Sequence, residues 1–111
     1  MLNQSIIVGR IVHEPEIRET ENGTKVTNIT LAVQRSYKNV NGEYDTDFIP
    51  CVLWKGIAET TAEYCKKGDL IGVRGRIQTK VLEKEDNSKK YLTELVAERV
   101  TFLSSKRQEA E

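Results

Sequence analysis

Hydrophobic and polar residues alternate along most of the chain with a period of two, and turn residues interrupt this alternation. Such a pattern is typical of a small barrel or sandwich of β-strands. We expect five strands, which cover residues 4–13, 25–37, 43–54, 70–81 and 90–103. Gly23 and Gly42 each follow an asparagine between two of these segments. Because Asn-Gly tolerates positive φ, both sites predict tight chain reversals.

One segment between the third and fourth expected strands has helical rather than alternating periodicity. Over residues 56–68, the hydrophobic positions at i, i+4 and i+7 are Ala58, Ala62 and Cys65. This spacing predicts one short amphipathic helix. We expect Gly56 to be its N-cap, and the two lysines before Gly68 suit the C-terminal end of a helix.

The third expected strand is unusual because both of its faces are hydrophobic. In an extended chain, Ile49, Cys51 and Leu53 lie on one face, and Phe48, Pro50, Val52 and Trp54 lie on the other. The first set can line a barrel core. The second set has two explanations: it is covered by a helix or another subunit, or its rings remain exposed to bind a ligand.

Cations next to the aromatic residues favour a ligand with flat rings and negative charge. Arg35, Tyr37 and Lys38 are close together before the third strand, and Lys55 follows Trp54. Bases of single-stranded nucleic acid stack on aromatic side chains, and Lys and Arg neutralise the phosphates. Along the fourth strand, one face carries Arg74, Arg76, Gln78 and Lys80. An ordinary solvated sheet face is the alternative explanation for that strand.

Composition adds few constraints and excludes several classes of protein. A length of 111 residues predicts one domain, and 17 basic against 17 acidic residues give no net charge. Cys51 and Cys65 match no metal or redox spacing, so we expect two buried thiols. The only histidine, His13, has no partner for catalysis. We therefore expect no enzyme, cofactor or metal site. Without a signal peptide or membrane span, we expect a cytoplasmic, nucleoid-associated protein.

The order of elements, three strands, a helix and two long strands, is compatible with the OB-fold, a five-stranded, partly open Greek-key barrel. The chain resembles the bacterial single-stranded DNA-binding proteins. The resemblance covers residues 1–103 and rests on MLNQSIIVGRIVHEPEIRETENGTKVTNITLAVQRSYKN, DFIPCVLWKGIAETTAEYCKKG, IGVRGRIQTKVLEKE and YLTELVAERVTFL. It implies an OB-fold domain over 1–103, with residues 104–111 as a short polar extension that we expect to be frayed.

The resemblance also implies a homotetramer around which single-stranded DNA is wrapped, with the first strand helping to pair subunits. Tyr37, Phe48 and Trp54 match aromatic stacking positions of the family. The cations at or beside its DNA-contacting positions are Arg18, Lys38, Lys55, Arg76 and Lys80. Local charge adds Arg10, Arg35 and Arg74 as further phosphate contacts.

The sequence departs from the family pattern in three respects. Leu82 stands where relatives often have an aromatic residue, so we expect one stacking contact fewer. Ile49 and Pro50 replace polar or basic residues, which weakens phosphate contact there. The sequence ends at Glu111 without the usual long acidic tail, so either a tail was removed or no partner is recruited through it. One conflict, which we call the parity problem, also remains. Arg35 and Tyr37 lie two and four residues after the expected core residue Val33, so a regular strand would point all three side chains into the core. The strand must bend, bulge or run past the barrel.

These observations predict a non-enzymatic, sequence-tolerant binder of single-stranded DNA that protects the strand during replication, recombination and repair. Its expected partners are single-stranded DNA, further copies of the chain and replication or repair proteins. The alternative is an OB-fold adaptor that binds a partner protein tightly and DNA weakly. Stacking and phosphate contacts leave the choice between DNA and RNA open.

Overall fold

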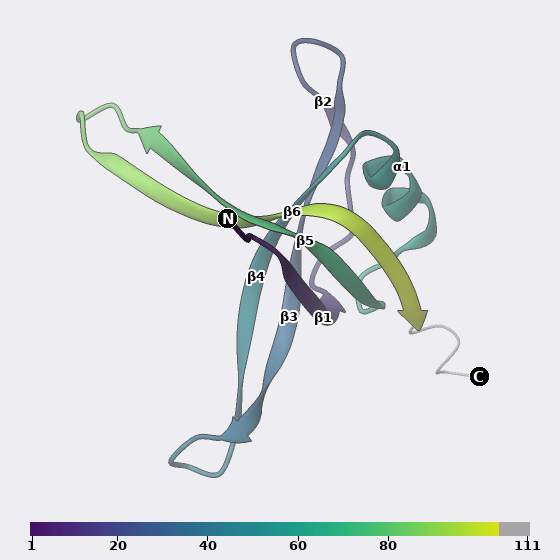
Figure 1. Ribbon diagram of the computed structural model, residues 1–111, viewed down its shortest axis with the longest axis vertical. Helices are drawn as coiled ribbons and strands as arrows, with labels where there is room; N and C mark the ends of the chain where they lie inside the picture. Colours follow the sequence, from purple (N-terminus) through teal and green to yellow (C-terminus); the bar gives the residue numbers. More distant parts are fainter. Residues whose placement is uncertain (105–111) are drawn as a thin grey trace.

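In the computed structural model, which describes residues 1–104, the strands form a closed barrel from which hairpins project (Figure 1). The elements in chain order are β1 (Ser5–Ile11), β2 (Arg18–Glu19), β3 (Lys25–Lys38), β4 (Tyr44–Trp54), α1 (Lys55–Tyr64), β5 (Leu70–Glu83) and β6 (Lys89–Ser104). The five predicted strands and the helix are all present. Of the predicted extension over residues 104–111, residues 105–111 lie outside the described part of the chain.

The strand pairings identify the barrel as an OB-fold, as predicted. The sheet order is β1-β5-β6-β4-β3-β2, and β1 also pairs with β3, which closes the five long strands on themselves. The only parallel contact among the described strands joins β4 to β6, where Cys51 is opposite Leu95 and Val52 opposite Val96. The two-residue strand β2, which pairs with the start of β3, was not predicted. It is too short to produce an alternating pattern in the sequence.

The barrel interior is filled by one face of each long strand together with one face of the helix. Its buried residues are Ile11, Ile29, Leu31, Cys51, Leu53, Ala58, Cys65, Ile71, Val73, Leu95 and Ala97. The prediction that Cys51 and Leu53 face the core is confirmed, and Ile49 packs against the same cluster. Both cysteines are free and buried, as predicted. Burial raises the pKa of Cys51 to about 12 and that of Cys65 to about 11, so both thiols stay protonated near neutral pH.

The helix begins and ends earlier than the sequence predicted. Gly56 is not the N-cap but lies inside α1; the N-cap is Trp54, whose side chain makes no capping hydrogen bond. The strand passes directly into the helix, because the last residue of β4 is the N-cap and Lys55, with a φ of 56°, is the first residue of α1. The helix ends at Tyr64, and the lysines that follow belong to a turn in which the Lys66 N–H donates to Asp69 Oδ2 at 2.8 Å.

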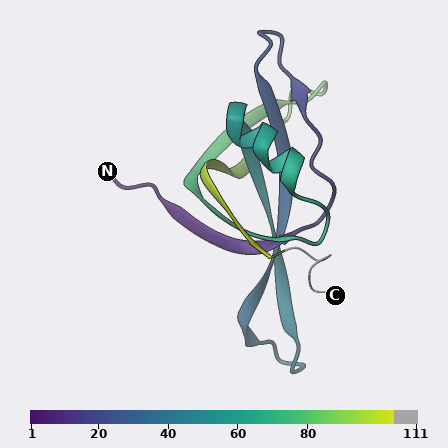
Figure 2. The same ribbon diagram turned by 90° about the vertical axis from the view of Figure 1, so that its right-hand side faces the viewer.

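The helix lies against the barrel, and it contacts β3, β4 and β6 (Figure 2). Ala58 and Thr61 are its buried residues, whereas the predicted core position Ala62 is only half-buried. Among the described residues, no helix combines the length and hydrophobicity that a membrane crossing requires.

The β3–β4 hairpin runs past the end of the barrel, and this extension answers the parity problem. In Figure 1 this hairpin projects downward, and the β5–β6 hairpin projects to the upper left. The register of β3 with β4 shifts between Gln34 and Lys38, where β3 carries more residues than its partner. Because the strand both bulges and leaves the barrel, its residues after Val33 are exposed to solvent. Gly42, at the turn, has the predicted positive φ, as does Gly23.

Candidate nucleic-acid interface

The outer face of β4 keeps the aromatic side chains of Phe48 and Trp54 open to solvent. Phe48 is 62% exposed and Trp54 is 37% exposed, whereas Val52 between them is buried. Side chains that lie two residues apart on a strand share a face, so all three belong to the surface opposite the core. The centre of this face is therefore buried together with Val26 and Val96 of the neighbouring strands, and its aromatic residues are exposed.

Cross-strand pairing places a cation in line with Trp54. Arg18 of β2 is opposite Val26 of β3, and Val26 is opposite Trp54 of β4. Residues that are directly opposite in neighbouring strands share one face of a sheet. Arg18 and Trp54 therefore lie on the same face, with one valine between them. Arg18 is thus placed beside the aromatic residue despite the four glutamates near it in the sequence.

A second row of the same face brings another cation near the aromatic residues. Asn28 is opposite Val52, Val52 is opposite Val96, and Val96 is opposite Arg76. Val26, Val52 and Val96 form a small buried cluster of their own on this outer face. The face therefore has a packed valine centre, with Arg18 on one side and Arg76 on the other.

The β3–β4 hairpin extends the aromatic surface beyond the barrel. Tyr37 is 63% exposed, and near the tip the Lys38 ammonium lies 5.8 Å from the centre of the Tyr44 ring, within cation–π range. Phe48 lies in the same hairpin but nearer the barrel, opposite Ala32. The predicted stacking residues Tyr37 and Phe48 thus share one hairpin, while Trp54 lies at the barrel end of β4.

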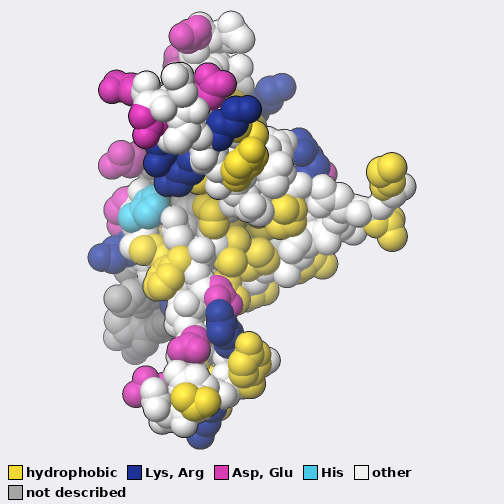
Figure 3. Space-filling model, turned by 90° about the vertical axis from the view of Figure 1, so that its left-hand side faces the viewer, with side chains coloured by type: hydrophobic (Ala, Val, Ile, Leu, Met, Phe, Trp, Pro, Cys, Tyr) yellow, Lys and Arg dark blue, Asp and Glu magenta, His cyan; other side chains and the backbone are white. Residues whose placement is uncertain are grey.

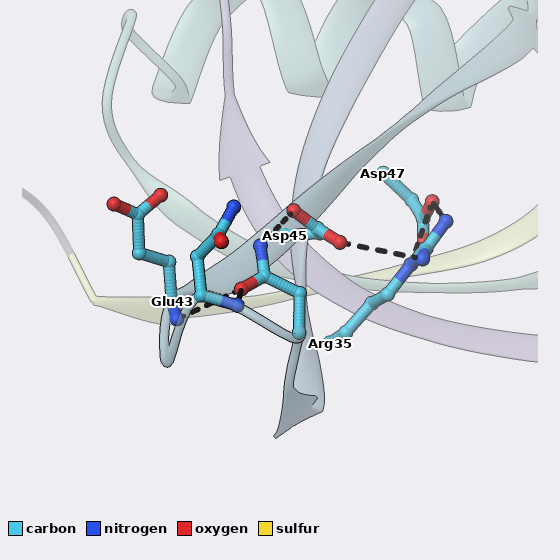
Figure 4. Close-up of polar contacts among 6 residues, drawn as sticks. Arg35, Glu43, Asp45 and Asp47 are labelled. Atoms are coloured by element: carbon cyan, nitrogen blue, oxygen red, sulfur yellow. Dashed lines mark hydrogen bonds and ion pairs between the residues drawn. The ribbon is translucent and has the colours of Figure 1, made fainter.

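Arg35 differs from the other predicted phosphate contacts because two carboxylates bind it (Figure 4). Its Nε donates to Asp47 at 3.3 and 3.1 Å, and its Nη2 donates to Asp47 Oδ1 at 2.9 Å. Nη1 lies 3.7 Å from Asp45 Oδ2. The hydrogen bonds from Arg35 lower the pKa of Asp47 below its usual value, and in return they raise the pKa of Arg35. Both groups are therefore charged near neutral pH.

Three further predicted cations also have partners within the chain. Lys80 forms an ion pair with Glu94 at 3.0 Å. Arg76 Nη1 donates to the Gln78 side chain at 2.8 Å. Arg10 Nη1 donates to the Gly68 carbonyl at 2.9 Å, in the connection between α1 and β5. The carboxylate of Glu94 neutralises Lys80, whereas the uncharged amide of Gln78 leaves the positive charge of Arg76 in place.

The remaining predicted cations, Arg18, Lys55 and Arg74, have no ion-pair partner among residues 1–104. Lys55 is exposed directly after Trp54. Arg74 is opposite Ile6 of β1 and Arg99 of β6, so it lies in the part of β5 that pairs with β1. The structure therefore brings Arg18, Lys55 and Arg76 near Trp54 and places Arg74 toward β1.

Tyr91, an exposed aromatic residue beside two lysines, was not among the predicted stacking residues. Tyr91 of β6 is 69% exposed and lies opposite Val81 in the β5–β6 hairpin, next to Leu82 and its partner Lys90. The signal was present, because Tyr91 directly follows Lys89 and Lys90. The same rule, an aromatic residue beside cations, selected Tyr37.

Hydrophobic side chains gather across the middle of one side of the molecule, and charged side chains are concentrated toward its two ends (Figure 3). Around β1, β5 and β6 there is also an open hollow of about 300 Å³, lined by Ile6, Val8, Gly72, Val73, Arg74, Arg99, Thr101 and Leu103. Ile6 is 72% exposed there. Within the described range, no group of three or more His, Cys, Asp or Glu residues could hold a metal ion.

Known proteins resemble this chain over most of its length. The profile of the single-strand binding protein family matches residues 2–103. The chain is 47% identical over 109 residues to "Single-stranded DNA-binding protein B" of Bacillus subtilis, covering 98% of this chain and 96% of that protein. It is 49% identical over 106 residues to "Single-stranded DNA-binding protein 3" of Listeria innocua, covering 96% of this chain. It spans 66% of the Listeria protein and 56% of a similar protein from Enterococcus faecalis.

Proposed function

The chain belongs to the single-strand binding protein family, and on this premise we propose that it binds single-stranded DNA through the outer face of β4. The family consists of binding proteins, and roles in replication, recombination and repair are typical of it. Protection of the exposed strand, in the cytoplasm at the nucleoid, is the function that follows for this chain.

One observation carries the proposal: open aromatic rings lie on a sheet face that is flanked by guanidinium groups. Phe48 and Trp54 are accessible on β4, and Arg18 and Arg76 are on either side of the valine cluster between them. Each stacked base is worth about 1 to 3 kcal/mol whatever its identity, because every base has a π face. The binding is therefore sequence-tolerant.

The predicted contact residues fall into groups with different support. Tyr37, Phe48 and Trp54 remain the stacking candidates, and Tyr91 joins them because it is exposed beside lysines. Among the phosphate candidates, the best supported are Arg18, Lys38, Lys55 and Arg76. The other four candidates are weaker. Arg35 and Lys80 are paired with carboxylates. Arg10 contacts the connection before β5, and Arg74 lies opposite β1.

We further propose that the chain forms a homo-oligomer, most simply the tetramer that the family resemblance implies. Ile6, Val8 and Leu103 are exposed hydrophobic residues around the hollow at β1. Residues 5–9 of β1 pair with β5 on one edge only, so the other edge can accept a second strand. A second copy of this chain would cover both the edge and the hydrophobic residues. Multi-angle light scattering of the wild type and of Ile6→Glu tests this, with a smaller assembly expected for the variant.

A titration with thymidine homopolymer tests the DNA-binding proposal directly. The chain has one tryptophan, so its emission reports on Trp54 alone. Stacking on Trp54 predicts quenching, and phosphate contact predicts that affinity falls as salt rises. An unchanged emission, or an affinity independent of salt, would contradict the proposal. A parallel titration with uridine homopolymer measures the preference for DNA over RNA.

A further inference from the structure

The contact between Arg35 and Asp47 resembles the contact that an arginine makes with a phosphate. Asp47 accepts hydrogen bonds from Nε and Nη2 of Arg35, with a shortest distance of 2.9 Å (Figure 4). A guanidinium binds carboxylates and phosphates with the same planar edge and the same pair of N–H groups. Because Asp47 occupies that edge, Arg35 cannot use it for DNA until the carboxylate moves away.

The position of this pair makes it relevant to the DNA interface. Asp47 directly precedes Phe48 on β4, and Arg35 is two residues before Tyr37 on the neighbouring strand. Neighbouring residues of a strand point to opposite faces, so the Arg35–Asp47 pair lies on the face of the hairpin opposite Phe48. Tyr37 is the proposed stacking residue that follows Arg35 on the same strand, and a DNA strand stacked on Tyr37 would carry its phosphates past the Arg35 guanidinium.

The ion pair is accessible enough for exchange. The side chains of Arg35 and Asp47 are each 41% exposed, and exposed ion pairs contribute little stability. Asp45, with its carboxylate 3.7 Å from Nη1, adds a second negative charge that attracts Arg35 and repels phosphate. A phosphate can thus replace Asp47, but only by competing with it.

Resting on the proposed function, we propose that Asp47 competes with DNA phosphate for Arg35 and so limits how tightly the β3–β4 hairpin binds single-stranded DNA. While Asp47 occupies Arg35, the hairpin contributes base stacking without this cation's share of the counterion release. The hairpin therefore binds DNA more weakly, and with less dependence on salt, than it would if Arg35 also contacted a phosphate.

The test compares Asp47→Asn, Arg35→Gln and the double variant in the thymidine homopolymer titration at several salt concentrations. Asp47→Asn removes the competing charge and keeps a side chain of the same shape. We expect it to bind DNA about two- to fivefold more tightly at low salt, since the competing contact is an exposed ion pair. The slope of log K against log salt should steepen by about 0.7, the value for one additional phosphate contact on a single strand.

Glu43→Gln is the matched control. Glu43 lies in the same hairpin, and no cation among residues 1–104 pairs with its carboxylate. It removes one negative charge without releasing an arginine, so the slope should not change. In the Arg35→Gln background, Asp47→Asn should likewise leave the slope unchanged. Thermal unfolding and Trp54 emission of each free variant verify that the barrel is intact.

The outcomes separate this proposal from the proposed function. Weaker binding by Asp47→Asn with a shallower slope would show that Asp47 positions Arg35 for DNA, and would overturn the competition. An unchanged slope would show that Arg35 does not reach a phosphate, which also overturns it. If the wild type itself fails to bind the homopolymer, the proposed function fails instead. An NMR readout independent of affinity is the Arg35 Nε–H resonance, which should shift on DNA binding if Arg35 changes its partner.

Discussion

Replacing Phe48 by alanine distinguishes a stacking residue from a structural one. With 62% of the residue exposed, about 38% of its surface is buried within the chain. Taking about 200 Å² for a phenylalanine, this corresponds to roughly 75 Å² of buried surface, or about 2 kcal/mol at 25 cal/mol per Å². Because the unfolded chain also buries part of this area, we expect the loss in unfolding free energy to be below that figure.

Phe48→Ala should also weaken DNA binding, an effect that a purely structural residue would not have. Loss of one base stack costs about 1 to 3 kcal/mol, which is roughly a 5- to 150-fold loss in affinity. The variant keeps Trp54, so the quenching titration with thymidine homopolymer measures the affinity of wild type and variant with the same probe. Urea unfolding at one fixed protein concentration measures the stability, since oligomer formation makes stability depend on concentration.

Tyr64 offers a matched control for this substitution. It is 63% exposed, almost the same as Phe48, but it lies on α1 and contacts Phe102 at a ring-centre distance of 6.2 Å. Tyr64→Ala should therefore lose a comparable amount of stability and keep its DNA affinity. The stacking argument is refuted if Phe48→Ala and Tyr64→Ala both bind DNA as tightly as the wild type. It is also refuted if Phe48→Ala loses several kcal/mol of stability with unchanged DNA affinity.

Three further predictions concern the barrel. Leu53→Ala, at a fully buried core position, should lower the unfolding free energy by about 2 to 5 kcal/mol in urea unfolding. Gly75→Ala should cost about 1 to 3 kcal/mol in the same assay because the new methyl group would collide with the Val96 carbonyl, whereas Gly56→Ala in open space should be neutral or stabilising. Both thiols should resist a disulfide reagent at pH 8 in the native protein and react fully in denaturant, since burial raises their pKa to about 12 and 11; rapid native labelling would contradict this.

Strand periodicity was enough to predict the two faces of β4 and most of the barrel. Alternation put Cys51 and Leu53 in the core and left Phe48 and Trp54 outside, because a strand buried on one face fixes the direction of every second side chain. The resemblance to a family supported the closure of the barrel, which alternation alone does not determine.

The features that sequence reasoning missed depend on tertiary geometry. Alternation assumes a regular strand, so it could not locate the register shift after Gln34 that resolves the parity of Tyr37. The helix cap was misassigned because Lys55 adopts a positive φ that glycine would usually supply. The partners of Arg35 were not predicted, since its carboxylates are 10 and 12 residues away across a bulged hairpin.

Local pairing of charges explains how a chain without net charge can bind a polyanion. On β2, Arg18 and Glu19 are neighbours, so they point to opposite faces of the sheet, and only the arginine shares the face of Trp54. The eight predicted cations would give a salt slope of up to about −5.6 per chain, at about −0.7 for each phosphate contact. Arg35 and Lys80 are neutralised by carboxylates, and each such pair lowers the magnitude of that limit by about 0.7. The charge that DNA meets is therefore set by which cations have carboxylate partners, and not by the number of cations in the sequence.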